Sequence, residues 1–331
     1  MEPLRVGFIG AGVFSTWAIY PALHLAPIDL RAVCDTDEAK ARSVASRFGG
    51  RGRWYTDHRR MWEEEDLEAL IVWMKPGARQ DLVLEALEAG YHVLVPKPPA
   101  LSLQACRELA SASTRTGRNV MVHFHRRFSQ GVSHAREIMQ RPSFGQLTQL
   151  FCSFCSGVYD DVRGAGYDSP VHAYLCDFAV HHLDIARWLG GEVREASTYH
   201  DERGGGASFA IALRFESGAV ANLQLNSQRV WWRNYDRIEI TGQGEYILID
   251  GLWGCRHYTA TDNTFSENYS DERSTELGGD GAALAEFVGS IREGRAPVSS
   301  IQDAVRTMCL YQAIYDAYLA GRQGRLDLPE P

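Results

Sequence analysis

Short uninterrupted apolar runs alternate with amphipathic segments over the first 125 residues of the chain. The runs are rich in Val, Ile, Leu and aromatic residues, and they cover residues 4–9, 30–34, 69–74, 91–95 and 120–124. Runs of this kind are typical of parallel strands that are covered on both faces. Helical patterns lie between them, at residues 13–26, 37–48, 80–89 and 102–116. The alternation predicts a doubly wound parallel sheet, that is an α/β domain, at residues 1–125.

The pattern changes in the second part of the chain. Strand-like runs that alternate apolar with polar residues occur at residues 146–156, 207–215, 219–226, 236–241 and 245–250. Helical patterns occur at residues 130–140, 176–190, 282–292 and 301–320. Alternation indicates strands with one face less buried, as in antiparallel sheets. We therefore expect an α+β domain at residues 126–331, built on a large, mainly antiparallel open sheet.

Composition and charge narrow the functional classes. The 331 residues carry 34 basic and 42 acidic side chains, and the net charge of −8 lies entirely in residues 126–331. An acidic second domain argues against a nucleic acid partner, because phosphate binding needs a basic surface. Without a membrane-spanning run or a signal peptide, and with seven cysteines mostly inside apolar runs, the chain is expected to be cytoplasmic, with reduced thiols.

A glycine-rich turn follows the first predicted strand. Gly10, Gly12 and Ser15 form a G-x-G-x-x-S sequence at the start of the first helical pattern. In this context the glycines permit a tight turn and the close approach of a pyrophosphate to the helix N-terminus. Asp35 ends the second predicted strand, where an acidic residue accepts hydrogen bonds from the adenosine ribose. With Asp37 nearby, it disfavours a 2′-phosphate, so the sequence predicts NAD rather than NADP.

Two further segments carry candidate chemistry. Lys97, one of only three lysines, lies between prolines at the end of a predicted buried strand, where ligands of open α/β sheets bind. Asp177, His181 and Asp184 are spaced i, i+4 and i+7 in a helical pattern and should share one face, which suits proton transfer. A metal ion there would need further ligands from residues such as His123, His125, His172 or His182, and we expect none.

Together these motifs resemble the family of glucose–fructose oxidoreductase and inositol dehydrogenase. The resemblance rests on the V-G-F-I-G-A-G start, on Asp35, on A-G-Y-H-V-L-V-P-K-P at residues 89–98 and on D-F-A-V-H-H-L-D at residues 177–184. It implies an N-terminal Rossmann domain and a C-terminal domain whose open sheet commonly forms a subunit interface. It also implies a dehydrogenase that transfers a hydride between NAD and a secondary hydroxyl of a sugar, polyol or cyclitol.

The resemblance also implies roles for individual residues. Lys97, Asp177 and His181 form the expected catalytic set, with His181 as the base. Residues expected to contact the cofactor are Gly10, Gly12, Val13, Phe14, Ser15, Asp35, Met74, Pro76 and Lys97. Residues expected to contact a sugar-like substrate are Arg127, Tyr159, His172, Asp177, His181, Trp231 and Tyr235. A homo-oligomer, dimer or tetramer, is expected through the C-terminal sheet.

The chain departs from the family pattern on the cofactor side. Pro96 replaces the usual Glu before the Lys-Pro pair, Met74 replaces a small residue, and Gln80 replaces a His. These departures motivate one alternative: a non-catalytic NAD(P)-binding regulator or sensor with the same fold.

Overall fold

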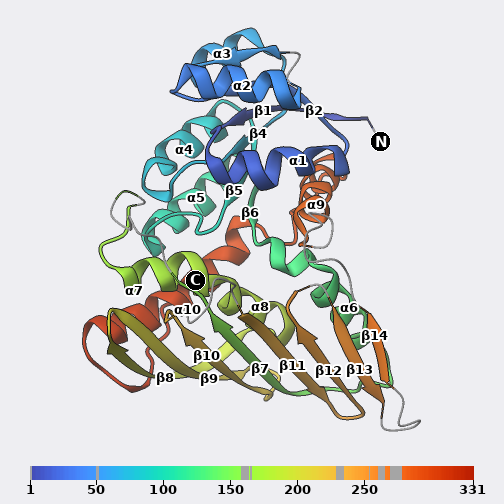
Figure 1. Cartoon of the computed structure of the whole chain (residues 1–331), viewed down its shortest axis with the longest axis vertical. Coiled ribbons are helices and arrows are strands. Elements are labelled where there is room, and N and C mark those ends of the chain that lie inside the picture. The colour runs from blue at the N-terminus through green and yellow to red at the C-terminus, as the bar shows by residue number, and fades with distance from the viewer. Residues whose placement is uncertain are drawn as a thin grey trace. The chain divides into compact units, whose positions relative to one another are not determined.

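The computed structural model describes residues 2–49, 52–157, 164, 166–228, 235–252, 254–259, 265–268 and 278–331 (Figure 1). The chain divides into two units. Unit 1 comprises Met1–His125 and Gly279–Val305, and unit 2 comprises Arg126–Gly278 and Arg306–Pro331. Residues 279–305, which the sequence analysis assigns to the second domain, belong to unit 1. None of the described helices combines the length and apolar character needed to cross a membrane.

Unit 1 contains a six-stranded parallel sheet with the order β3-β2-β1-β4-β5-β6. Its strands are β1 (Leu4–Ile9), β2 (Ile28–Cys34), β3 (Trp54–Tyr55), β4 (Ala69–Val72), β5 (His92–Pro96) and β6 (Val120–His123). Its longer helices are α2 (Glu38–Phe48), α3 (His58–Glu64), α4 (Gln80–Glu88), α5 (Leu103–Thr116) and α9 (Asp280–Arg292). This is the doubly wound sheet that the apolar runs predict, with β3 and α3 as additions.

Helix starts in unit 1 follow from side-chain caps. Asp37 accepts a hydrogen bond from the backbone N–H of Lys40, and Ser102 accepts one from Ala105. The single helix expected at residues 13–26 is instead divided into a π-helical turn at Ser15–Ile19, α1 (Tyr20–Ala22) and a 3-10 turn at Leu23–Leu25. Pro21 explains the division, because it lacks the N–H that an α-helix needs and its ring crowds the preceding turn.

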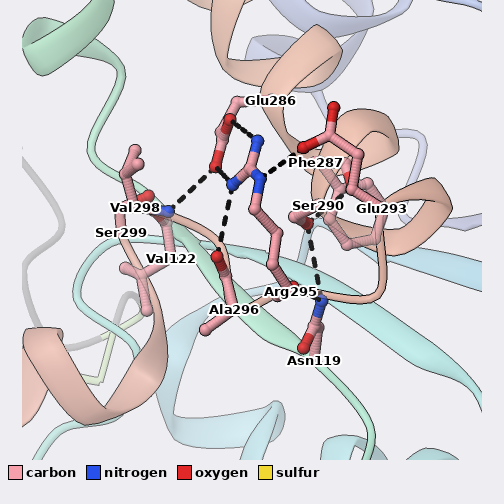
Figure 2. Close-up of polar contacts among 10 residues, drawn as sticks. All are labelled: Asn119, Val122, Glu286, Phe287, Ser290, Glu293, Arg295, Ala296, Val298 and Ser299. Carbon is pink, nitrogen blue, oxygen red and sulfur yellow. Dashed lines mark hydrogen bonds and ion pairs between the residues drawn. The ribbon is translucent and has the colours of Figure 1, made fainter.

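The return of residues 279–305 to unit 1 covers an open sheet edge. β6 is the last strand of the sheet, and an uncovered edge strand leaves backbone groups unpaired. Val122 and Ser299 close this edge: the Val122 N–H donates to the Ser299 carbonyl at 2.8 Å, and Ser299 Oγ donates to the Val122 carbonyl at 2.8 Å. Figure 2 shows this pairing beside Asn119, whose side-chain amide donates to the Arg295 carbonyl at 2.9 Å.

Unit 2 contains a nine-stranded sheet with the order β14-β13-β12-β11-β7-β10-β9-β8-β15. The strands are β7 (Leu147–Cys155), β8 (Val193–Arg203), β9 (Gly206–Phe215), β10 (Val220–Asn226), β11 (Tyr235–Gly242), β12 (Glu245–Asp250), β13 (Cys255–Thr259), β14 (Phe265–Asn268) and β15 (Gly324–Arg325). All neighbours are antiparallel except β7 and β10. The expected mainly antiparallel open sheet is confirmed.

Helices cover one face of this sheet (Figure 1). They are α6 (Gln130–Met139), α7 (Pro170–Ala173), α8 (Val180–Gly190) and α10 (Ile301–Leu319), whose first residues belong to unit 1. In β10, residues 221, 223 and 225 are buried, whereas residues 220, 222 and 224 are exposed. The period of two in the sequence therefore reflects a sheet with one face covered by helices and one face uncovered.

Candidate functional site

The glycine-rich turn has the geometry of a nucleotide-binding loop. Gly10 has φ +107°, and a Cβ atom there would lie 2.2 Å from the Trp73 carbonyl oxygen, so only glycine fits. A Cβ on Gly12 would meet nothing within 4 Å, which leaves the backbone open to a ligand. Ser15 Oγ lies 3.0 Å from the carbonyl oxygens of both Gly10 and Gly12. Ser15, which stands at the third position of the glycine motif, therefore stabilises the loop.

Asp35 links the end of β2 to this loop. Its Oδ2 accepts a hydrogen bond from the Ala11 N–H at 2.7 Å, and its Oδ1 accepts one from the Asp37 N–H at 2.9 Å. Each carboxylate oxygen can accept a second hydrogen bond, so the group can still receive ribose hydroxyls. Val13 is 90% exposed and Phe14 is 52% exposed, which places two apolar side chains of the loop in solvent.

The loop after β4 is held by a buried arginine that sequence reasoning did not single out. Arg79 is fully buried; its Nη1 donates to the Met74 carbonyl at 3.1 Å, and its Nη2 donates to the Pro98 carbonyl. Arg79 thus joins the loops that carry the expected cofactor contacts Met74, Pro76 and Lys97. Trp73 lies before Met74, and its ring is stacked parallel to that of Phe14 at 6.1 Å.

Lys97 directly follows β5 and is half-buried, as expected for the carboxyl end of a buried strand. Its neighbour Pro96 is paired with His123 across β5 and β6. Burial and, to a smaller extent, the positive charge of Lys97 together lower the pKa of His123 to about 3. His123 is therefore a neutral imidazole at neutral pH, close enough to Lys97 to feel its charge.

Three potential metal ligands meet beside Lys97. Donor atoms of His123, His125 and Asp280 all lie within 4.8 Å of one another, and all three residues belong to unit 1. Burial raises the pKa of Asp280 to about 7. Asp280 begins α9, and sequence reasoning missed it because the segment that brings α9 back to unit 1 carries no recognisable signal.

In unit 2, Asp177 and His181 lie on the helix that the sequence predicts, but this helix is not a regular α-helix throughout. Residues Tyr174–Ala179 form a π-helical turn between α7 and α8. Asp177 is 6% exposed and His181 is 5% exposed, so both are buried. A π-turn has more residues per turn than an α-helix, so the i, i+4, i+7 spacing does not follow regular α-helical geometry here. π-turns are frequent at functional sites.

Asp184 and His182, which are close to this pair in the sequence, have partners of their own. Asp184 binds Arg127 through two hydrogen bonds, one of them from Nε at 2.6 Å, and both side chains are 1% exposed. This pairing neutralises the charge of Arg127 inside unit 2 and argues against the expected contact of Arg127 with substrate. His182 points elsewhere too, with Nε2 2.8 Å from Asp236, which also pairs with Arg126. These contacts with Arg126 and His182 keep the pKa of Asp236 below its ordinary value although burial raises it.

The other expected substrate contacts are placed as follows. His172 is buried in an aromatic cluster, stacked on Tyr315 at 4.8 Å and edge-on to Tyr167 at 5.3 Å. Tyr159 and Trp231 lie outside the described residues, and Tyr235 begins β11, where only its backbone is described. Asp177, His181 and His172 thus remain as described candidates in unit 2.

Sequence comparison assigns both parts of the chain to one family. Residues 4–124 match the profile described as "Oxidoreductase family, NAD-binding Rossmann fold". Residues 132–247 match the "GFO/IDH/MocA C-terminal domain". The chain belongs to the GFO/IDH/MocA oxidoreductase family.

Individual relatives agree with this assignment. D-apiose dehydrogenase of Paraburkholderia graminis is 25% identical over 98% of this chain and 89% of its own length. Myo-inositol 2-dehydrogenase of Thermotoga maritima is 25% identical over 93% of this chain and 94% of its own length. A solved structure of levoglucosan dehydrogenase in complex with NADH has a TM-score of 0.86 at 19% identity, with 100% of both chains covered. The predictions of family, fold class, oxidoreductase activity and NAD as cofactor are confirmed.

Proposed function

We propose that this member of the family is an NAD-dependent dehydrogenase that oxidises a secondary hydroxyl of a sugar, polyol or cyclitol, or reduces the matching carbonyl. The observation that carries the proposal is the retained chemical set: Lys97 at the carboxyl end of β5, and Asp177 with His181 on a buried helix. The named relatives, dehydrogenases of D-apiose and myo-inositol, support this substrate class.

The proposed mechanism assigns one task to each residue. The chemistry that bound NAD+ would supply is acceptance of the hydride from the carbinol carbon. The His181 imidazole takes the hydroxyl proton, and the Lys97 ammonium donates a hydrogen bond to the oxygen as negative charge develops on it. Asp177 is proposed to orient these partners. The products are a ketone, NADH and one proton, so the atoms and charges balance.

The proposed cofactor preference is NAD over NADP. Asp35 and Asp37 stand at the end of β2, and Asp35 is anchored by the glycine-rich loop. A 2′-phosphate there would meet two carboxylates, and like charges at close range disfavour binding.

The test is NADH production across a panel of sugars, polyols and cyclitols. Lys97→Ala and His181→Asn should each reduce kcat by about 10²–10⁴-fold on the substrate found. The control His134→Asn, on α6, should retain full activity, and circular dichroism and NAD titration check folding of all variants. If NAD binds but no panel member is turned over, the sensor function takes its place. A Lys97→Ala protein as active as the parent would remove Lys97 from the mechanism.

We also propose that the protein is a homo-oligomer through the uncovered face of the nine-stranded sheet. This face carries the exposed side chains Tyr199, Val220 and Tyr258. Light scattering should give a dimer or tetramer mass, and Tyr199→Glu should shift the population toward monomer. A monomeric parent protein at micromolar concentration would contradict this.

A further inference from the structure

The carboxyl end of β6 holds a group of side chains that the proposed mechanism does not use. His123 ends the strand, His125 follows two residues later, and Asp280 starts α9. Their donor atoms all lie within 4.8 Å of one another. Two imidazoles and a carboxylate are a ligand set that metalloenzymes use for zinc and related ions.

His123 carries the strongest sign of a missing ligand. It is 2% exposed, and within the described part of the chain its Nε2 has no hydrogen-bond partner. Buried polar atoms are normally bonded, so an unbonded one calls for an explanation. The nearest acidic atom, Asp280 Oδ1, is 3.5 Å away. That separation matches the roughly 3.4 Å between two ligands of one tetrahedral ion with metal–ligand bonds of about 2.1 Å.

The surrounding structure fixes the positions of these ligands. α9 packs closely on the segment before β2, because a Cβ atom on Gly281 would lie 2.6 Å from Leu25. After α9, Ser299 is bonded to Val122 in β6 from both directions (Figure 2). Asp280 is therefore held near the end of β6 by contacts of two residues that follow it in the sequence, Gly281 and Ser299. His125 is half-buried.

We propose that His123, His125 and Asp280 bind a divalent transition-metal ion of the zinc class, with a fourth position open to water or another oxygen ligand. Imidazole ligands favour zinc, cobalt or nickel over magnesium and calcium, which prefer oxygen ligands. Three protein ligands with one open position are the pattern of catalytic rather than structural zinc sites.

The location suggests a task for the ion, and this step rests on the proposed function. His123 is paired with Pro96, the last residue of β5, and Lys97 directly follows Pro96. An oxygen bound at the open position would be polarised by the ion acting as a Lewis acid, which helps a hydroxyl to release its proton. No electron transfer to the ion is required.

The experiment uses full-length protein that has been stripped with chelator and titrated with Co²⁺, then Zn²⁺. Co²⁺ should produce visible d–d absorption that saturates at one ion per chain, and Zn²⁺ should abolish that absorption by displacement. Asp280→Asn and His125→Ala should each weaken binding by more than the roughly 10–100-fold typical of losing an outer-shell partner. The matched controls His24→Ala and Asp81→Asn alter exposed residues of unit 1 and should bind as the parent does.

NAD titration and circular dichroism on the same samples show whether each variant is folded. Absence of saturable Co²⁺ absorption in the folded parent would overturn the metal site, and so would unchanged binding in both folded ligand variants. Because these readouts need no substrate, the metal site can stand if no dehydrogenase substrate is found. Conversely, activity unchanged by chelator would refute the Lewis-acid task and leave the proposed dehydrogenase intact.

Discussion

Asp35 has two tasks at the end of β2, and a substitution can separate them. It anchors the glycine-rich loop through the Ala11 N–H, and its charge is expected to select the unphosphorylated ribose. Asn keeps an acceptor oxygen but removes the charge. We expect Asp35→Asn to weaken NAD binding by about tenfold, equivalent to about 1.4 kcal/mol, and to strengthen NADP binding relative to NAD.

Calorimetric titration of both dinucleotides against the parent and the variant measures this change. Asp57→Asn is the control, because Asp57 caps α3 and is exposed. A variant with an unchanged NAD-to-NADP ratio would show that the carboxylate charge does not select the cofactor.

Arg79 is predicted to be a positioning residue for the two loops that it joins. Arg79→Met removes the donors to the carbonyls of Met74 and Pro98, and a buried unsatisfied carbonyl costs about 1–3 kcal/mol. We expect the free energy of unfolding to fall by about 2–4 kcal/mol and the KM for NAD to rise, with Arg79→Lys intermediate because one ammonium group cannot span both carbonyls.

Urea unfolding and initial rates at varied NAD measure the two effects. Gln104→Met is the control, since Gln104 of α5 is exposed and bonds the exposed Glu108 among the contacts described. A loss of stability with an unchanged KM for NAD would reduce Arg79 to a purely structural residue.

At the scale of elements, regular patterns were predictable and local distortions were not. The apolar runs located β1, β2, β4, β5 and β6 because strands buried on both faces need continuous apolar sequence. The π-turn at Tyr174–Ala179 has no comparable signal, since the same residues can form an α-helix with a different register. The sequence therefore located Asp177 and His181 on this helix but did not indicate that Asp184 pairs with Arg127.

The Arg127–Asp184 ion pair links α8 to the structure around it. Thr307 Oγ1 also donates to Asp184 at 3.2 Å, so the pair connects α8 with α10. Asp184→Asn leaves a buried guanidinium without its counter-charge and should cost about 3–5 kcal/mol of unfolding free energy. The double variant Arg127→Met with Asp184→Leu should recover most of this loss, because both charges are then absent.

Thermal and urea unfolding of the parent, the single variant and the double variant test this prediction. The double variant should also keep its dehydrogenase activity, because Arg127 no longer belongs to the proposed substrate contacts. Loss of substrate affinity without loss of stability would restore Arg127 to that set.

At the scale of the whole chain, the order of elements predicted two sheets but not the return of α9. Each sheet could be predicted because its strands lie near one another in the sequence or share one pattern of apolar and polar residues. The attachment of residues 279–305 to β6 depends on contacts more than 150 residues apart, such as Ser299 with Val122. No local pattern records such a contact, so the position of Asp280 beside His123 became visible only in three dimensions.

Contacts of Glu286 hold the returning segment 279–305 in place, and they should make the free energy of unfolding depend on pH. Glu286 of α9 accepts two hydrogen bonds from Arg295, at 2.6 and 2.8 Å, and one from the Val298 N–H at 2.9 Å (Figure 2). Burial alone raises the pKa of Glu286, but these bonds lower it by more, so its pKa in the folded protein lies below the ordinary value. A lowered pKa contributes stability that is complete above the unfolded value of about 4.3 and is lost as the pH falls through the folded pKa.

Glu286→Gln should therefore lower the free energy of unfolding at about pH 7 by about 1–2 kcal/mol, which is measured as a lower urea midpoint. The difference between the variant and the parent should shrink toward about pH 3. The matched control is Glu293→Gln, because Glu293 bonds the same arginine at 2.6 Å but is 53% exposed, where an ion pair contributes little. Because these contacts of Glu286 fix the position of α9, Glu286→Gln should also weaken Co²⁺ binding if the proposed metal site exists, whereas Glu293→Gln should not. A difference from the parent that stays constant across this pH range would show that the Glu286 charge does not secure the returning segment.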